Sequence, residues 1–133
     1  MATTTFSGPV RSQNGFQNIS ISSTTGVATT TSTYGDAAIV GVQSLSGAGA
    51  VNLTTSLTSL TTTGAAQALT LADGTAGQIK IVVHAVDGGS AVLTPTTKIG
   101  FSTITFTGVG ESATLVYTAA GWAIVALNGA VSA

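Results

Sequence analysis

The sequence predicts an all-β protein, an antiparallel and jelly-roll-like β-sandwich that carries an extended N-terminal arm. Three observations support this fold class. Only 5% of the 133 residues are charged while 44% are hydrophobic, so hydroxyl groups and glycine replace the usual surface charge. Threonine, which is β-branched and suits an uncharged strand face in water, occurs in runs such as "ATTTSTYG" and "LTTSLTSLTTTG". Short apolar–polar alternations recur between glycine-containing breaks.

Residues 1–17 form the predicted arm. They have no sustained period and are broken by Gly8, Pro9 and Gly15, so their few large apolar side chains cannot pack a core of their own. Pro9 stiffens the segment, the residues around it can still pair with a sheet edge of a partner, and Arg11 is placed to meet a partner's carboxylate. The partner-contact candidates are Phe6, Pro9, Val10, Arg11 and Phe16. A frayed terminus is the alternative interpretation.

Residues 18–133 form the predicted sandwich domain, in which each alternating segment has the length of about four to nine residues that is typical of a strand. The predicted strands are 18–22, 37–45, 66–72, 78–86, 90–94, 103–107, 112–118 and 122–127. Residues 51–60 are ambiguous because Leu53, Leu57 and Leu60 lie at helical spacing. The threonines and serines between these leucines are poor helix formers, so we expect extended structure there.

Two turns in the last third of the chain predict β-hairpins. Asp87-Gly88-Gly89 joins two apolar runs, and its glycines accept the positive φ that tight hairpins demand. Ala119-Ala120-Gly121 has the spacing of a type I turn that is closed by a glycine. We therefore expect each turn to connect two antiparallel neighbours.

The stretch 78–100 concentrates the polar chemistry of the chain, because it holds two of the three basic residues and the only histidine. Alternation along 78–86 predicts an apolar face made of Ile79, Ile81, Val83 and Ala85. The opposite face is mixed and contains Lys80 and His84. We expect Lys80, His84 and Lys98 to be solvated or to lie at a subunit interface.

A catalytic or metal site would need further groups that converge on His84. The chain has no cysteine, and its four acidic residues are scattered among turns: Asp36, Asp73, Asp87 and Glu111. We therefore expect no enzyme activity, no catalytic residues, no cofactor and no metal ion.

Charge and hydropathy also limit the classes of partner. The net charge of −1 gives no long-range field that would attract a nucleic-acid backbone or an anionic membrane. The first residues lack a basic region followed by an apolar run, and no apolar run reaches the roughly 18 residues of a membrane span. We expect a soluble protein without an export signal.

Several stretches resemble small virion proteins of tailed bacteriophages, especially head decoration proteins, which stabilise (cement) the capsid. They are "FSGPVRSQNGF", "ALTLADGTAGQIKIVV", "GGSAVLTP" and "TITFTGVGESATLVYTAAGWAIVALNG". The resemblance implies a homotrimeric β-protein, made in the host cytoplasm, that binds the major capsid protein on the outer surface of the head. The same arrangement also looks like the β-rich modules of phage fibres or spikes, so host-surface binding is the alternative function.

The residues fit a structural role on physical grounds. A surface of Thr, Ser, Gly and Ala has few long side chains to immobilise in subunit contacts, and almost no charge protects its strand edges from pairing. The subunit-interface candidates are Tyr117 and Trp122, although Trp122 directly follows a turn and core packing is its other interpretation. A glycan site of a fibre tip would have to use Tyr34, Tyr117 or Trp122.

Overall fold

The computed structural model describes residues 16–34 and 41–133, and the side chains of 22–27 and 41–133. Within these residues the fold is all-β and contains no helix, which confirms the predicted fold class. The strands are β1 (Phe16–Ile21), β2 (Ala28–Tyr34), β3 (Val42–Ser46), β4 (Gly49–Val51), β5 (Leu57–Thr61), β6 (Gln67–Leu71), β7 (Ile79–Val86), β8 (Ala91–Pro95), β9 (Ile104–Phe106), β10 (Ser112–Thr118), β11 (Gly121–Asn128) and β12 (Val131–Ser132). The ambiguous segment 51–60 is extended, as predicted.

The chain divides into two compact units, Met1–Ala38 and Ile39–Ala133. In the first unit β1 and β2 form a two-stranded antiparallel sheet with a bulge between Asn18 and Ile19. The predicted sandwich boundary at residue 18 is therefore too early, because β1 and β2 share no sheet with the later strands. An alternating pattern predicts a strand but not the sheet to which the strand belongs.

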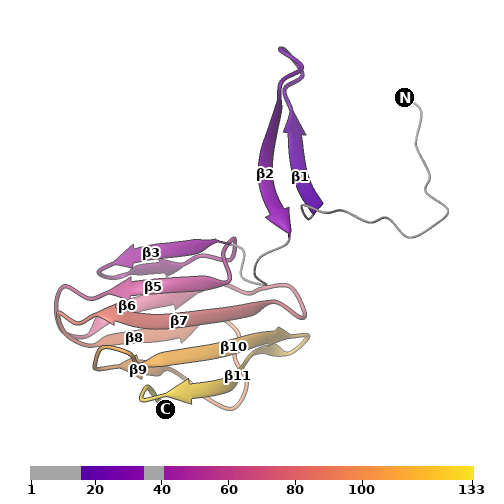
Figure 1. The fold of residues 1–133 in the computed structure, drawn as a ribbon. Coiled ribbons are helices and arrows are strands. Elements are labelled where there is room, and N and C mark those ends of the chain that lie inside the picture. The colour runs from indigo at the N-terminus through magenta and orange to yellow at the C-terminus, as the bar shows by residue number, and fades with distance from the viewer. Residues whose placement is uncertain (1–15, 35–40) are drawn as a thin grey trace. The chain divides into compact units, whose positions relative to one another are not determined.

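The second unit is a sandwich of two five-stranded sheets (Figure 1). We call the sheet with the strand order β11-β10-β7-β5-β3 the front sheet, and the sheet with the order β12-β9-β8-β6-β4 the back sheet. From β3 to β8 the chain alternates between them, so that β3, β5 and β7 run parallel in the front sheet and β4, β6 and β8 run parallel in the back sheet. The later strands β9 to β12 then add antiparallel pairs to both sheets.

The sandwich is as predicted, but the predicted antiparallel, jelly-roll-like pairing is wrong for β3 to β8, which pair parallel, so that both sheets are mixed. Residues 42–95 form a three-layer coil in which each layer contributes one strand to each sheet, as in a β-solenoid. The side-chain period of two is the same for parallel and antiparallel neighbours, so the sequence pattern does not determine the direction of pairing.

The turn at Asp87-Gly88-Gly89 shows how the coil forms. It does not close a hairpin, as predicted, but carries the chain from β7 in the front sheet to β8 in the back sheet. Both glycines lie against the preceding layer: a Cβ on Gly88 would lie 2.4 Å from the carbonyl oxygen of Thr62, and a Cβ on Gly89 would lie 2.5 Å from the backbone of Gly64. Glycine is therefore required at both positions because the backbones of two layers lie so close together. Gly89 also has a φ of 137°, which other residues rarely adopt.

The second predicted hairpin is confirmed. Residues Ala119 and Ala120 connect β10 to β11, which pair antiparallel, and Gly121 has a φ of 128°. A Cβ at Gly121 would also lie 2.9 Å from the backbone nitrogen of Lys98. This position therefore requires glycine both for its conformation and for the close approach of residues 97–98.

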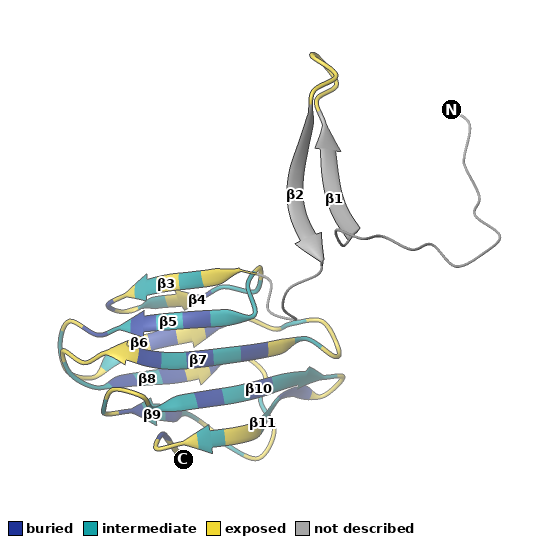
Figure 2. Ribbon diagram, in the orientation of Figure 1, coloured by how far each residue is buried: buried dark blue, intermediate teal, exposed yellow. Residues whose placement is uncertain are grey.

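The core lies between the two sheets (Figure 2). The back sheet lines it with apolar side chains, which include Leu69, Leu71, Leu93, Ile104 and Phe106. The front sheet contributes fewer apolar residues, and several of its fully buried positions are polar. This difference between the sheets determines where a functional surface can lie.

Candidate functional site

The two polar residues of β7 point into the sandwich, which contradicts the prediction that they meet water or a neighbouring subunit. Lys80 and His84 are both 0% exposed, and Val82 between them is equally buried. The predicted apolar face of the same strand is the outer one, because Ile79 is 52% exposed while Ile81 and Val83 are half-buried. The strand therefore has the opposite orientation to the one that its polarity predicts.

Lys80 is held by the loop that enters β5. Its Nζ donates hydrogen bonds to the backbone oxygen of Thr55 at 2.8 Å and to Thr55 Oγ1 at 3.2 Å. Both acceptors are uncharged, so they do not replace the hydration that the ammonium group loses. Burial accordingly lowers the pKa of Lys80 to about 8.

A chain of polar side chains continues from Lys80 to the edge of the front sheet. Thr55 donates from both its backbone nitrogen and its hydroxyl group to Asn52 Oδ1. The backbone nitrogen of Asn52 and the hydroxyl group of Thr58 both donate to Gln43 Oε1, at 2.8 and 2.9 Å. These groups form hydrogen bonds with one another, as buried polar groups usually do. The hydrogen bonds connect β3, the loop that precedes β5, and β5 itself.

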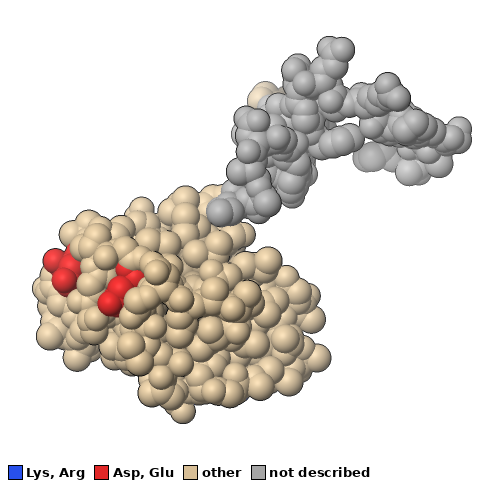
Figure 3. Space-filling model, turned by 60° about the horizontal axis from the view of Figure 1, so that its bottom comes forward, with Lys and Arg blue, Asp and Glu red and all other residues tan. Residues whose placement is uncertain are grey.

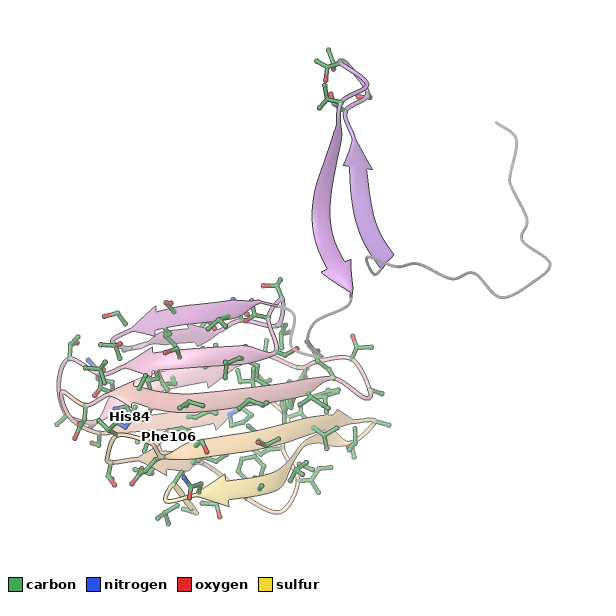
Figure 4. The ribbon with its side chains drawn as sticks, viewed as in Figure 1. His84 and Phe106 are labelled. Atoms are coloured by element: carbon green, nitrogen blue, oxygen red, sulfur yellow. The ribbon has the colours of Figure 1, made fainter. Side chains whose placement is uncertain are left out.

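His84 occupies the other end of the same inner face. Its Nε2 lies 3.0 Å from Thr62 Oγ1, which also accepts a hydrogen bond from the backbone N–H of Gly88 at 2.8 Å. The ring packs edge-on against Phe106 of the back sheet, with centroids 6.5 Å apart (Figure 4). Nδ1 is buried and has no hydrogen-bond partner among the described residues.

The carboxylates near this region are used locally in turns. Asp87 accepts from the backbone N–H of Gly89. Glu111 accepts from the backbone N–H and the hydroxyl group of Thr107, and the backbone hydrogen bond is the main reason why the pKa of Glu111 is lowered. Asp73 accepts from the backbone and the hydroxyl group of Thr97. No group of three or more potential metal ligands occurs within residues 16–34 and 41–133.

The two subunit-interface candidates lie side by side and pack in the sandwich. Trp122 is fully buried, its Nε1–H donates to the backbone oxygen of Ala72 at 2.8 Å, and it packs against the half-buried Tyr117 with ring centroids 5.1 Å apart. Core packing, the other interpretation of Trp122, therefore accounts for its contacts within one chain. Lys98 is half-buried, and its Nζ donates to the backbone oxygen of Pro95.

The arm candidates lie mostly outside the described residues. Phe6, Pro9, Val10 and Arg11 precede the described part of the chain, as does most of the predicted arm 1–17. Phe16 is the first residue of β1, and its side chain is not among those described. The role of these five residues as partner contacts stays a prediction.

The outer face of the front sheet is the most distinctive surface of the sandwich, and the sequence analysis missed it as a surface. Two rows of aliphatic side chains cross it in register. One row joins Val42, Leu57 and Ile81 across β3, β5 and β7, and the other joins Ile79, Val116 and Ala123 across β7, β10 and β11. The signal was present in the sequence, since Ile79, Ile81 and Val83 alternate, but it was interpreted as the side that faces the core.

No charged side chain projects from this outer face among the described residues. The rows beside the aliphatic ones carry serine and threonine, as in the row of Ser44, Ser59, Val83 and Ser112. On the side of the sandwich that Figure 3 shows, two small groups of acidic atoms interrupt a surface that is otherwise uncharged. The outer face of the front sheet can thus form apolar and hydroxyl contacts but offers no ion pair.

The comparisons with known proteins do not extend the resemblance that the sequence suggests. No protein-family model matches the chain, and no curated protein matches it. The described residues also include no helix that could cross a membrane. The arguments for function consequently rest on the chain itself.

Proposed function

We propose that the protein is a structural virion protein that binds the assembled capsid of a tailed bacteriophage as a homotrimer and decorates or stabilises the outer surface of the head. The observation that carries the proposal is the aliphatic, uncharged outer face of the front sheet. Contact with a partner within an assembly would remove these aliphatic side chains from water, which stabilises the assembly. Its partners are the major capsid protein and further copies of itself.

The composition of the surface supports the same role. Only 5% of the residues are charged, and the net charge is −1. Many copies can therefore lie close together on a shell without strong mutual repulsion, and small hydroxyl side chains lose little conformational entropy in the contacts. The resemblance to head decoration proteins in residues 6–16 and over much of 68–129 supports the head as the proposed location of this assembly.

The alternative, a fibre or spike module that binds the host surface, finds less support in the aromatic residues. Glycan sites commonly use an exposed aromatic platform. Among the residues whose side chains are described, Trp122 and Phe106 are fully buried, and Tyr117 is half-buried against Trp122. Tyr34 ends β2, and its side chain is not among those described.

Binding to heads tests the proposal directly. Phage heads from which the protein has been removed are mixed with increasing amounts of the purified protein, and the bound fraction is measured by co-sedimentation. We expect saturable binding at a fixed number of copies per capsid subunit. A variant that lacks residues 1–15, which leaves β1 whole, tests the arm, and we expect it to fold and trimerise but to fail to bind heads. Recovery of the protein from tails or fibres, and not from heads, would contradict the proposal.

A further inference from the structure

The orientation of β7 exposes the more apolar of its two faces. The strand buries Lys80, Val82 and His84 and turns Ile79, Ile81 and Val83 outward. A shift of one residue would exchange the two faces, placing three aliphatic side chains in the core and the lysine and histidine in water. For an isolated sandwich that exchanged orientation would be the more favourable one, since burying an ammonium group carries a large desolvation cost.

The neighbouring strands follow the same arrangement, so it is not an accident of one strand. Leu57 of β5 lies beside Ile81, and Thr58, which is fully buried, lies beside Val82. On the other side Val116 of β10 lies beside Ile79. Three adjacent strands therefore present branched aliphatic residues outward, and two of them present polar residues inward.

The area of the outer face of the front sheet can be compared with the area that a protein–protein interface buries. Five strands about 4.8 Å apart, with about 3.3 Å per residue along them, give the front sheet an outer area of roughly 500 Å². A stable specific interface buries about 800 Å² on each partner. A subunit of a trimer meets two neighbours, so the face can supply part of the area that these contacts need, and adjoining surfaces must supply the rest. The face is broad, where a peptide-binding site would be a groove or an edge.

We propose that the outer face of the front sheet faces the threefold axis of the homotrimer, where the three copies of this face enclose a shared apolar core. The occupant is a further copy of the chain because the surface that fits the face best is another broad face without charge, and the chain itself provides one. Identical uncharged faces meet without like-charge repulsion, and the serine rows beside the aliphatic rows allow close approach. The inference rests on the trimeric state in the proposed function and adds the surface that forms it.

Two valines provide a matched test. Val83 is a half-buried, outward residue on β7, the middle strand of the front sheet, and Val92 is a half-buried, outward residue on β8, the middle strand of the back sheet. The variants Val83→Glu and Val92→Glu therefore add the same charge at equivalent places on opposite faces. Light scattering after size-exclusion chromatography measures the mass, and circular dichroism and thermal unfolding report on the fold of each variant.

We expect the wild-type protein and Val92→Glu to have three times the 12.9 kDa mass of one chain at micromolar concentration. Val83→Glu should be a folded monomer, with association weakened by about 100-fold or more, because each trimer would bury three unpaired carboxylates. If Val83→Glu does not fold, Ile81→Thr keeps a β-branched side chain at a neighbouring outward position, and we expect it to weaken association by about 10-fold.

Three results would overturn the inference: a trimer of Val83→Glu as stable as the wild type, equal loss of association in Val83→Glu and Val92→Glu, or a wild-type monomer. A wild-type monomer that binds heads through this face, so that only Val83→Glu fails to bind, would assign the face to the capsid. The proposed function fails separately: a trimer that dissociates on Val83→Glu but never binds heads would retain the inference and refute the decoration role.

Discussion

The two sheets of the sandwich use their faces in opposite ways. The back sheet turns leucine, isoleucine and phenylalanine inward, and outward it presents mainly small or hydroxyl-bearing residues such as Ala68, Thr70 and Thr94, with Val92 and Val131 as its aliphatic members. The front sheet turns lysine, histidine and threonine inward among apolar residues such as Leu60, Val82 and Leu115, and outward it presents Val42, Leu57 and Ile81. The outer face of the back sheet thus suits contact with water, whereas the proposed trimer would cover the front sheet on both faces.

The buried polar residues of the front sheet are only partly compensated by hydrogen bonds to residues far away in the sequence, since Nδ1 of His84 has no partner among the described residues. Thr55 receives the ammonium group of Lys80, and Thr62 lies between His84 and the turn at Gly88. The polar side of the front sheet can therefore lie against the apolar side of the back sheet. The front sheet buries less apolar area within one chain than the back sheet does. A partner that covers its outer face would bury more apolar area and so add stability.

The largest effect that we expect concerns the inner face of the back sheet. Leu93 is fully buried on β8, between β6 and β9. The substitution Leu93→Ala should lower the free energy of unfolding by about 2 to 5 kcal/mol, because it removes buried apolar area and leaves a cavity. Urea denaturation at a fixed protein concentration measures the loss. Thr94→Ala, on the outer face of the same strand, is the control and should change little.

The next effect concerns Lys80 and pH. Its pKa is about 8 in the folded protein and 10.5 in an unfolded chain, so between these values the unfolded chain binds a proton that the folded chain does not. The free energy of unfolding should therefore rise with pH in this window, by about 3 kcal/mol from pH 7.5 to 10.5. Urea denaturation at both pH values measures the change.

The variant Lys80→Met provides the control for that measurement. It has no group that titrates at this position, so its stability should lack the increase and should differ most from the wild type at the lower pH. An equal rise with pH in both proteins would mean that Lys80 keeps its proton equally well in the folded and unfolded states, and that the inner face of the front sheet is hydrated.

A smaller loss is expected from Thr62, which is 2% exposed. The substitution Thr62→Val keeps the shape of the side chain but removes the oxygen that accepts from Gly88 and contacts His84. It should cost about 1 to 3 kcal/mol, since buried polar groups lose their partner. Thr62→Ser retains the oxygen and should be closer to the wild type. A variant Thr62→Val as stable as the wild type would show that water replaces the hydroxyl group.

The sequence predicted most of the strands because alternation is a local property, although β2 and β12 were not among the predicted strands. The segments 78–86 and 112–118 correspond to β7 and β10 within one residue at each end, and the hairpin at Ala119 and Ala120 follows from a local turn preference. The direction of pairing was not predictable from the same pattern. Glycines at 88 and 89 are compatible with a hairpin or with a crossover, and only their approach to residues 62–65 decides between them.

The orientation of β7 could not be predicted either, because it depends on a partner far away in the sequence. Thr55, which accepts both hydrogen bonds from Lys80, lies 25 residues earlier. Polarity alone favoured the aliphatic face of 78–86 for the core. In the structure the aliphatic face of β7 points outward, because Lys80 on the other face is held by residues far away in the sequence. The apolar outer surface could therefore be identified only from the structure.

The smallest effect is expected on the outer face of the back sheet, where we expect a substitution to change neither stability nor association. Thr94 is exposed on β8, in the row with Thr70 and Ala50. The substitution Thr94→Lys should change the free energy of unfolding by less than about 0.5 kcal/mol, as is usual for a surface position, and should leave the mass of the protein unchanged. A loss of association in Thr94→Lys would mean that the back sheet is covered as well. The outer face of the back sheet would then be a second contact surface. The two sheets would differ in the kind of interface that they form, and neither outer face would be exposed to water.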